Sequence, residues 1–287
     1  MAPQTASTSL KGRNVLITGA SMGIGKAIAI AYAAEGANLA LLARSTDKLE
    51  AVAKEVRDTA SSHGHKITVT VQTADVRESS SIKEAVSTAA LHLSIDVGIG
   101  HSFDILINNA GLALSAPSPF WQQSIEDIAT MTQTNLFGFM AVAHAMLNEG
   151  GMANAKRGTI VNVTSTTGLE VPPFPGEAVY HASKAFQEAF GNVLRNETVG
   201  TNIRILTLRP GVVQTHFHEQ RVGYDQGQYD GFMDGIEALV AEDVAKAAVW
   251  MVQSEERVSI RAVDVIPSSQ RTLQVFDREW ERRNKSV

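Results

Sequence analysis

The 287-residue chain contains no cysteine. It therefore forms no disulfide and offers no thiolate that could act as a nucleophile or as a metal ligand. Because cysteine usage is what normally indicates the redox compartment of a protein, this sequence carries no indication of it.

The sequence also lacks long apolar runs and an excess of basic residues. No stretch approaches the roughly 20 apolar residues of a membrane-spanning helix, so we expect no membrane segment. Lysine and arginine number 25 against 30 aspartates and glutamates, and the net charge of −5 argues against a nucleic-acid or anionic-membrane surface. Residues 1–10 lack the basic start and apolar run of a signal peptide. We expect them to form a loose N-terminal tail on a cytoplasmic protein.

Short apolar runs alternate with helical stretches along the chain. The runs predict about seven buried strands, at residues 13–18, 38–43, 67–74, 103–108, 158–164, 201–208 and 259–266. Helices are expected at residues 26–35, 45–63, 78–93, 124–148, 178–199 and 241–254. This alternation predicts an α/β fold, a doubly wound parallel sheet of Rossmann type with helices on both faces. We expect a single domain over residues 11–267, followed by a C-terminal tail over residues 268–287.

A glycine-rich loop, residues 18–25 (TGASMGIG), lies between the first predicted strand and the first predicted helix. Glycines let the backbone turn tightly and approach a pyrophosphate, and the N-terminus of the helix offers unpaired N–H groups to it. The context therefore predicts a phosphate-binding loop of a dinucleotide site. A turn with a purely structural role is the alternative.

The second predicted strand, residues 38–43, ends without an acidic residue. In a dinucleotide-binding fold an acid about 20 residues past the glycines binds the ribose hydroxyls of the adenosine. Here Ala43 is followed by Arg44 and Ser45. A carboxylate would repel a 2′-phosphate, whereas an arginine pairs with one. Arg44 therefore predicts a preference for NADP(H), and the alternative is a surface arginine that starts the next helix.

Tyr180 and Lys184 stand four positions apart in the helix predicted over residues 178–199, so they share one face of it. A free phenol has a pKa of about 10, and a neighbouring ammonium lowers it. Such a tyrosine can pass a proton to or from an alcohol or carbonyl oxygen near neutral pH. Taken alone, the pair is more often two surface side chains, so its interpretation depends on the rest of the chain.

Two other stretches suggest functional roles. Asn135 lies within the long helix predicted over residues 124–148, where an asparagine is mildly unfavourable, so it suggests a function or a kink. Residues 214–236 show no clear period, as expected for a lid or a binding loop. Their aromatic residues would either line a pocket or pack the lid; these are Phe217, Tyr224, Tyr229 and Phe232. His216 and His218 lack a visible third ligand, so no metal site is predicted.

Taken together, these features resemble the short-chain dehydrogenase/reductase family over residues 10–267. The motifs stand in family order, with TGxxxGxG at residues 18–25, DV at 75–76, NNAG at 108–111 and PGxxxT at 210–215. The family's catalytic set is matched by Asn135, Ser165, Tyr180 and Lys184.

The resemblance implies a role for each of these residues. Tyr180 would be the general acid/base, and Lys184 would lower its pKa and hold the nicotinamide ribose. Ser165 would hydrogen-bond the substrate oxygen, and Asn135 would fix a water in a proton relay. The cofactor-binding residues implied are Gly19, Ser21, Met22, Gly23, Ile24, Gly25, Arg44, Ser45, Asp75, Val76, Asn109, Ala110, Gly111, Tyr180, Lys184, Pro210, Gly211, Val213 and Thr215.

The activity implied is hydride transfer between NADP(H) and a small carbonyl or secondary alcohol substrate, in a homo-oligomer that is a tetramer or a dimer. A non-redox member of the family, such as an isomerase, dehydratase, cyclase or cofactor-binding regulator, is the alternative. Met22 stands where many NADP-preferring members have a basic residue, so the cofactor preference rests on Arg44. Residues 263–270 depart from the common VDGG ending and look more like members acting on hydroxy acids or small polar ketones.

Overall fold

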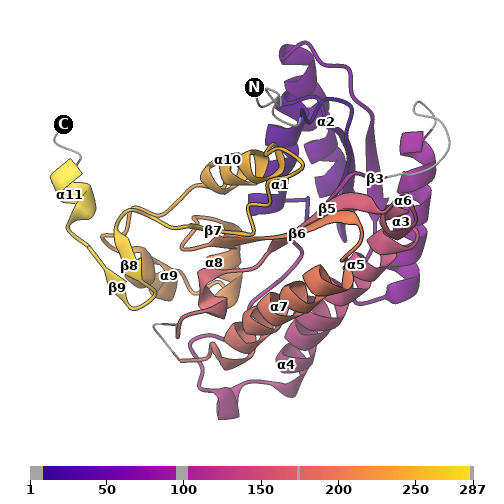
Figure 1. Ribbon diagram of the computed structural model, residues 1–287. Helices are drawn as coiled ribbons and strands as arrows, with labels where there is room; N and C mark the ends of the chain where they lie inside the picture. Colours follow the sequence, from indigo (N-terminus) through magenta and orange to yellow (C-terminus); the bar gives the residue numbers. More distant parts are fainter. Residues whose placement is uncertain (1–8, 95–102, 173–174, 285–287) are drawn as a thin grey trace.

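The computed structural model describes residues 9–94, 103–172 and 175–284 (Figure 1). Seven strands form one sheet in the order β3-β2-β1-β4-β5-β6-β7, and every neighbouring pair is parallel. The predicted α/β doubly wound fold is therefore confirmed. The strands are β1 (Asn14–Thr18), β2 (Asn38–Ala43), β3 (Val69–Thr73), β4 (Ile105–Asn108), β5 (Arg157–Val163), β6 (Asn202–Pro210) and β7 (Ala262–Val265). Residues 1–8 of the predicted N-terminal tail lie outside the described residues.

Helices cover both faces of the sheet, which explains why its central strands β1, β2 and β4 are mostly apolar and buried. In β2, Leu39 and Leu41 pack into one core cluster while Ala40 and Leu42 pack into the other, because successive side chains point to opposite faces. The first cluster lies under α1 (Gly23–Ala34), α2 (Thr46–Ser62) and α10 (Ala241–Val252), and the second under α3 (Ser79–Ser94), α5 (Phe139–Leu147) and α7 (Ala178–Glu197).

The strand order reverses beside β1, which lies between β2 and β4. The chain leaves β1 toward one side of the sheet and leaves β4 toward the other. In open α/β sheets a crevice forms at this point, outside the carboxyl ends of the strands, and ligands bind there. The topology thus places the glycine loop and the segment after β4 on opposite sides of one crevice.

The long helix expected over residues 124–148 is interrupted. The structure has α4 (Ile125–Thr132), a six-residue π-helical turn η2 (Gln133–Gly138) and then α5. Asn135 lies in this π turn and is completely buried. Short π turns inside α-helices are frequent at functional sites. The π turn therefore agrees with the function or kink that an asparagine in mid-helix suggested.

Residues 214–236 are not the irregular segment expected from the sequence. They form two short helices, α8 (His216–Arg221) and α9 (Gln226–Met233). The Thr215 side chain caps α8 and the Asp225 side chain caps α9. Helices of six and eight residues are too short to give a readable hydrophobic period, which is why the pattern was missed.

The segment expected to be a C-terminal tail folds against the rest of the protein. It forms a hairpin of β8 (Gln270–Thr272) and β9 (Val275–Phe276), followed by α11 (Trp280–Asn284). Gln270 and Leu273 are buried, and the backbone N–H of Leu273 donates to the Glu170 carboxylate at 2.8 Å. Short elements η1 (Phe120–Gln122), α6 (Met152–Ala155) and η3 (Thr166–Gly168) complete the fold. Within the described residues, none of the helices combines the length and apolarity that crossing a membrane requires.

Candidate active site

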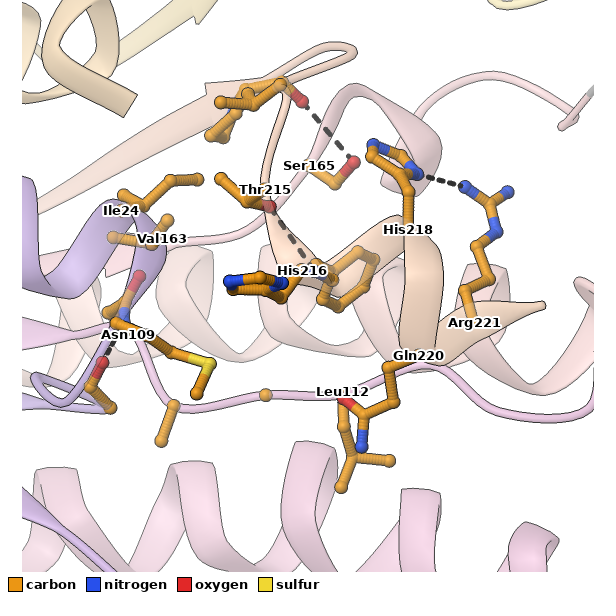
Figure 2. Close-up of a pocket in the computed structure, with 18 of the residues that line it drawn as sticks. Ile24, Asn109, Leu112, Val163, Ser165, Thr215, His216, His218, Gln220 and Arg221 are labelled. Carbon is orange, nitrogen blue, oxygen red and sulfur yellow. Dashed lines mark hydrogen bonds between the residues drawn. The ribbon is translucent and has the colours of Figure 1, made fainter. Parts of the chain in front are cut away.

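A cavity of about 960 Å³ opens at the carboxyl ends of the central strands. Its walls come from the glycine loop, the segments that follow β4, β5 and β6, and the first turns of α7 and α8. Figure 2 labels lining residues from several of these parts, among them Ile24, Asn109 and Thr215. Every cofactor-binding residue predicted from the sequence lines the cavity except Gly25, and Ser165, Tyr180 and Lys184 line it as well. Asn135 lies outside the lining. The fold therefore brings nearly all the predicted site residues to one place.

The glycine loop is packed so closely that two of its positions have no room for a side chain. A methyl group on Gly25 would lie 2.3 Å from the Gly19 carbonyl oxygen, and one on Gly19 would lie 2.8 Å from the Asn109 side-chain nitrogen. Gly19 also has φ +66°, a left-handed conformation that favours glycine. Asn109 Nδ2 donates to the Thr18 carbonyl at 2.9 Å and so ties the loop to the end of β4. Gly25 thus supports the loop from behind.

The opposite end of the cavity, at the ends of β2 and β3, carries Arg44, Ser45 and Asp75. Arg77 donates to the Asp75 carboxylate, with Nη2 at 2.6 Å from Oδ2 and Nε at 3.0 Å from Oδ1. This hydrogen bonding holds the pKa of Asp75 below its usual range, and the charge of Arg44 adds to the effect. The carboxylate is therefore already paired, and the exposed Arg44 brings positive charge to the mouth of the cavity.

Tyr180 and Lys184 are almost completely buried, with exposed fractions of 6% and 4%. Burial raises the pKa of Tyr180 above its ordinary value, an effect that Arg221 and a hydrogen bond with Ser165 oppose only in part. Burial also lowers the pKa of Lys184 to about 8, against the opposing charge of Glu188. Burial is thus the main influence on the pKa of Tyr180, and the charge that opposes it belongs to Arg221. That Lys184 lowers this pKa stays a prediction.

Asn135 and Ser165 complete the predicted catalytic set. The Asn135 side chain accepts from the Leu112 N–H at 3.0 Å and donates to the Leu112 carbonyl at 2.8 Å, which fixes the segment after β4 against the π turn. Ser165 follows β5, and its hydroxyl donates a hydrogen bond to the Pro210 carbonyl at 3.4 Å (Figure 2). Ser165 and Tyr180 both line the cavity, to which they bring two hydroxyl groups.

A buried ion pair that sequence reasoning missed lies near Tyr180. Arg221 Nε donates to the Glu177 carboxylate at 2.6 Å, and both side chains are buried. Arg221 Nη1 also lies 3.3 Å from His218 Nδ1 (Figure 2). Burial, reinforced by Arg221, lowers the pKa of His218 to about 3, so this histidine is neutral at neutral pH. Glu177 and Arg221 lie 44 positions apart and belong to no motif, so the sequence offered no signal for the pair.

Aromatic rings extend the wall outward from Tyr180. The ring centres of Tyr180 and Phe217 lie 5.5 Å apart, those of His218 and Phe232 lie 5.6 Å apart, and those of Phe232 and Phe276 lie 6.3 Å apart. Phe276 belongs to the C-terminal hairpin. The wall is therefore built jointly by α8, α9 and β9.

Three of the four aromatic residues considered from the sequence in this segment line the cavity; they are Phe217, Tyr224 and Phe232. Tyr229 does not. Leu273 and Phe276 line it too, and the sequence interpretation missed both because it treated their segment as a tail.

Metal-binding side chains are not gathered here. His216 Nδ1 bonds the Glu219 carboxylate at 2.6 Å. Over the part of the chain that the structure describes, no group of three or more histidine, aspartate or glutamate side chains could hold a metal ion.

Comparison with known proteins assigns the family. Residues 13–223 match the model of short chain dehydrogenase. The chain is 36% identical over 257 residues to sulfoacetaldehyde reductase of Chromohalobacter salexigens, which covers 89% of this chain and 94% of that protein. It is 34% identical over 262 residues to NADP-dependent 3-hydroxy acid dehydrogenase of Schizosaccharomyces pombe, with coverages of 91% and 95%.

A solved structure gives the same assignment. The closed form of serine dehydrogenase complexed with NADP+ matches with a TM-score of 0.78 and 31% identity, over 90% of this chain and 96% of that one. The family model spans every strand of the seven-stranded sheet except β7, and the relatives align along almost the whole chain. The protein therefore belongs to the short chain dehydrogenase family.

Proposed function

We propose that the protein is an NADP(H)-dependent oxidoreductase that interconverts a small carbonyl compound and its alcohol. The observation that carries this proposal is the convergence of Ser165, Tyr180 and Lys184 on one cavity that also has the glycine loop in its wall. Two relatives support the cofactor, since one is named NADP-dependent and the serine dehydrogenase structure contains NADP+.

The residues present fit such a cofactor. The cavity of about 960 Å³ extends from the ends of β2 and β3, past the glycine loop, to Tyr180. Gly19 and Gly25 let the loop pack tightly against its own backbone and Asn109. The N-terminus of α1 behind this loop would offer N–H groups to a pyrophosphate, and Arg44 lies where a 2′-phosphate would need a cation. When bound, the nicotinamide supplies or accepts the hydride.

The chain's own residues would supply the proton to the carbonyl oxygen. A Tyr180 whose pKa is raised stays protonated at neutral pH, as a proton donor to a carbonyl oxygen must. The Ser165 hydroxyl would donate a second hydrogen bond to the same oxygen and orient it. Lys184 would hold the nicotinamide ribose and keep a positive charge beside the forming phenolate. Asn135 would fix the loop that these groups depend on.

We propose a small polar or acidic substrate. Sulfoacetaldehyde and 3-hydroxy acids, named for two relatives, each carry an anionic group separated by one carbon from the reacting carbon. Arg221 lines the cavity near Tyr180, and its positive charge would attract such a group, although Glu177 partly neutralises it. Residues 214–236 would close over the substrate as a lid on a catalytic domain of residues 11–267, with the C-terminal hairpin completing the wall.

We propose further that the protein acts in the cytoplasm as a homo-oligomer, a tetramer by family resemblance. The interface would use the segment around α4 together with α7. Large apolar side chains are exposed on both, with exposed fractions of 81% for Trp121, 71% for Ile125 and 57% for Val193. Exposed apolar surface of this kind favours association. Light scattering at micromolar concentration tests this, and a monomer mass would contradict it.

The activity is tested by following NADPH absorbance with sulfoacetaldehyde and short 3-oxo acids, and NADP+ reduction with serine and 3-hydroxy acids. Turnover with at least one pair is expected. An isomerase, dehydratase or cyclase of the same fold would bind NADPH without consuming it. Tight NADPH binding with no consumption across the panel would therefore favour the non-redox alternative and reject the proposal.

A further inference from the structure

A buried glutamine connects Lys184 to the π turn. Gln187 lies three positions after Lys184 on α7 and has an exposed fraction of 1%. Its side-chain oxygen accepts from Lys184 Nζ at 3.1 Å, and its side-chain nitrogen donates to the main-chain carbonyl of Asn135 at 2.8 Å. One amide therefore bridges the ammonium and the backbone of the π turn, in a region closed to bulk solvent.

The bridge restricts Lys184 strongly. An ammonium has three N–H donors. One is directed to Gln187 and a second to the Val163 carbonyl at 3.2 Å, at the end of β5. Lys184 also lines the cavity, so the remaining donor is available to a ligand there. A lysine side chain has many rotamers, and two fixed hydrogen bonds select the one that points at the site.

The π turn supplies the other end of the bridge. In an ordinary α-helix, each carbonyl accepts from the N–H four residues later. The π turn over residues 133–138 breaks this pattern around Asn135, and its carbonyl accepts from Gln187. The family resemblance implies that Asn135 fixes a water in a proton relay. Here a side chain of the protein itself spans from Asn135 to Lys184.

We propose that Gln187 is a positioning residue that fixes the Lys184 ammonium and locks it to the π turn. The proposal rests on the proposed function for its catalytic meaning, since Lys184 acts there on the cofactor and on Tyr180. An amide does not pass on a proton as water does. Gln187 therefore holds Lys184 in place and charged.

The charged and titratable groups near Lys184 determine how the effect of Gln187 on the Lys184 pKa can be measured. Tyr180 lies one turn before it on α7, and Glu188 raises the pKa of Lys184 from the following turn. Glu188 is itself paired with Arg209 of β6 at 2.8 Å. The groups that contact Lys184 from β5 and the π turn, Val163 and the Asn135–Gln187 bridge, are uncharged. Gln187 is thus a neutral acceptor beside a desolvated cation, and its removal must disfavour the charged form.

The test compares Gln187→Met, which keeps the shape and removes both hydrogen bonds, with Gln187→Glu, which keeps an acceptor and adds a negative charge. Asn192→Met is the control, because it makes a similar change on the exposed side of α7. Lysine labelled with ¹³C at Cε is titrated by NMR in the protein without added NADPH, and the Lys184 signal is assigned with Lys184→Met.

We expect the pKa of Lys184 to fall by roughly one pH unit in Gln187→Met, the size of one hydrogen bond to a charged group, and to rise in Gln187→Glu. Asn192→Met should leave it unchanged. If Gln187→Met does not fold, Gln187→Leu, which also removes both hydrogen bonds, takes its place. An unchanged Lys184 titration in the folded Gln187 variants would overturn the proposal.

Kinetics separate this proposal from the proposed function. If wild type consumes NADPH, the alkaline limb of kcat/KM should move to lower pH in Gln187→Met, whereas a merely structural loss would lower kcat without moving the limb. If wild type consumes no NADPH, the proposed function fails, while the NMR titration still decides the role of Gln187.

Discussion

Lys184 Nζ lies 5.7 Å from the centre of the Tyr180 ring, one turn away on α7. The two groups share a buried site in which burial works against the charged form of each. Tyr180 is consequently held as the neutral phenol, and the ammonium of Lys184 is easier to deprotonate than a free lysine. Such a site favours proton donation by Tyr180, and it depends on conditions that keep Lys184 charged.

Replacing Tyr180 by phenylalanine should abolish turnover and leave NADPH binding nearly intact. The hydroxyl would be the proton donor, while the ring only packs against Phe217. Loss of general acid catalysis costs about 10²–10⁴-fold in kcat. Single-turnover kinetics and a fluorescence titration of NADPH measure the two effects. A variant that kept more than about a tenth of the wild-type kcat would reject the role.

Carbonyl reduction should decline as the pH rises through about 8, the pKa of Lys184. The direction of this pH dependence follows from the charge of Lys184. Below this pKa the ammonium is present and stabilises the phenolate that forms on Tyr180, and above it the charge is lost. A pH profile of kcat/KM in the NADPH direction measures the limb. The residual activity of Lys184→Met should lack it, and a limb retained in that variant would assign the titration to another group.

The parts of the site predicted from the sequence are those whose chemistry depends on near neighbours in the chain. The glycine loop needs small residues between a strand and a helix, and the Tyr180–Lys184 pair needs the spacing of one helical turn. Both signals are local, so they can be read without the fold. The position of Ser165 directly after a predicted strand is another local signal.

The parts of the site that were not predicted depend on contacts between segments distant in the sequence. Glu177 meets Arg221 only because α8 folds back over the start of α7. Phe276 reaches the cavity because the C-terminal hairpin packs beside α9. The pKa of Tyr180 likewise depends on burial, which the sequence does not reveal, and on the charge of Arg221 from a distant segment.

Replacing Gly25 by alanine should impair the loop even though Gly25 does not line the cavity. The added methyl group would lie 2.3 Å from the Gly19 carbonyl oxygen, so the loop must shift. We expect NADPH affinity to fall by at least about tenfold, as for a loss of roughly 1.4 kcal/mol. Gly231→Ala on α9 is the control, because its methyl group would meet no atom within 4 Å. Equal NADPH affinities in both variants would show that the loop tolerates the shift.

Replacing Phe276 by alanine should raise the KM for the carbonyl substrate and leave NADPH binding unchanged. Phe276 contacts Phe232 at the aromatic wall, far along the chain from the glycine loop. Truncating a partly buried aromatic side chain removes apolar contact on the substrate side alone. Initial rates at saturating NADPH measure the effect, and exposed Val275, the preceding residue, provides Val275→Ala as a control. A weaker NADPH affinity with an unaltered substrate KM would assign the hairpin to cofactor binding.

The enzyme should prefer NADPH over NADH, with Arg44 as the reason. Ala43 occupies the place where an acid would bind the ribose hydroxyls, so no carboxylate there repels a phosphate. Arg44 and Ser45 follow it at the mouth of the cavity. A hydrogen bond to a charged group is worth roughly 1.5–3 kcal/mol, which corresponds to about tenfold to a hundredfold in affinity.

The exposure of Arg44 sets a second expectation, because the interaction of an exposed charge with a phosphate is screened by salt. The preference for NADPH should therefore shrink at high ionic strength.

Installing the missing acid with Ala43→Asp, together with Arg44→Ala, should shift the preference toward NADH, since the carboxylate would accept from the ribose hydroxyls and repel the phosphate. The decisive measurement is the ratio of kcat/KM for the two cofactors with one substrate, in wild type and in the double variant. Arg77, whose side chain is already paired with Asp75, should contribute little to this ratio. A ratio that the double variant left unmoved would mean that Arg44 is only a surface residue at the start of α2.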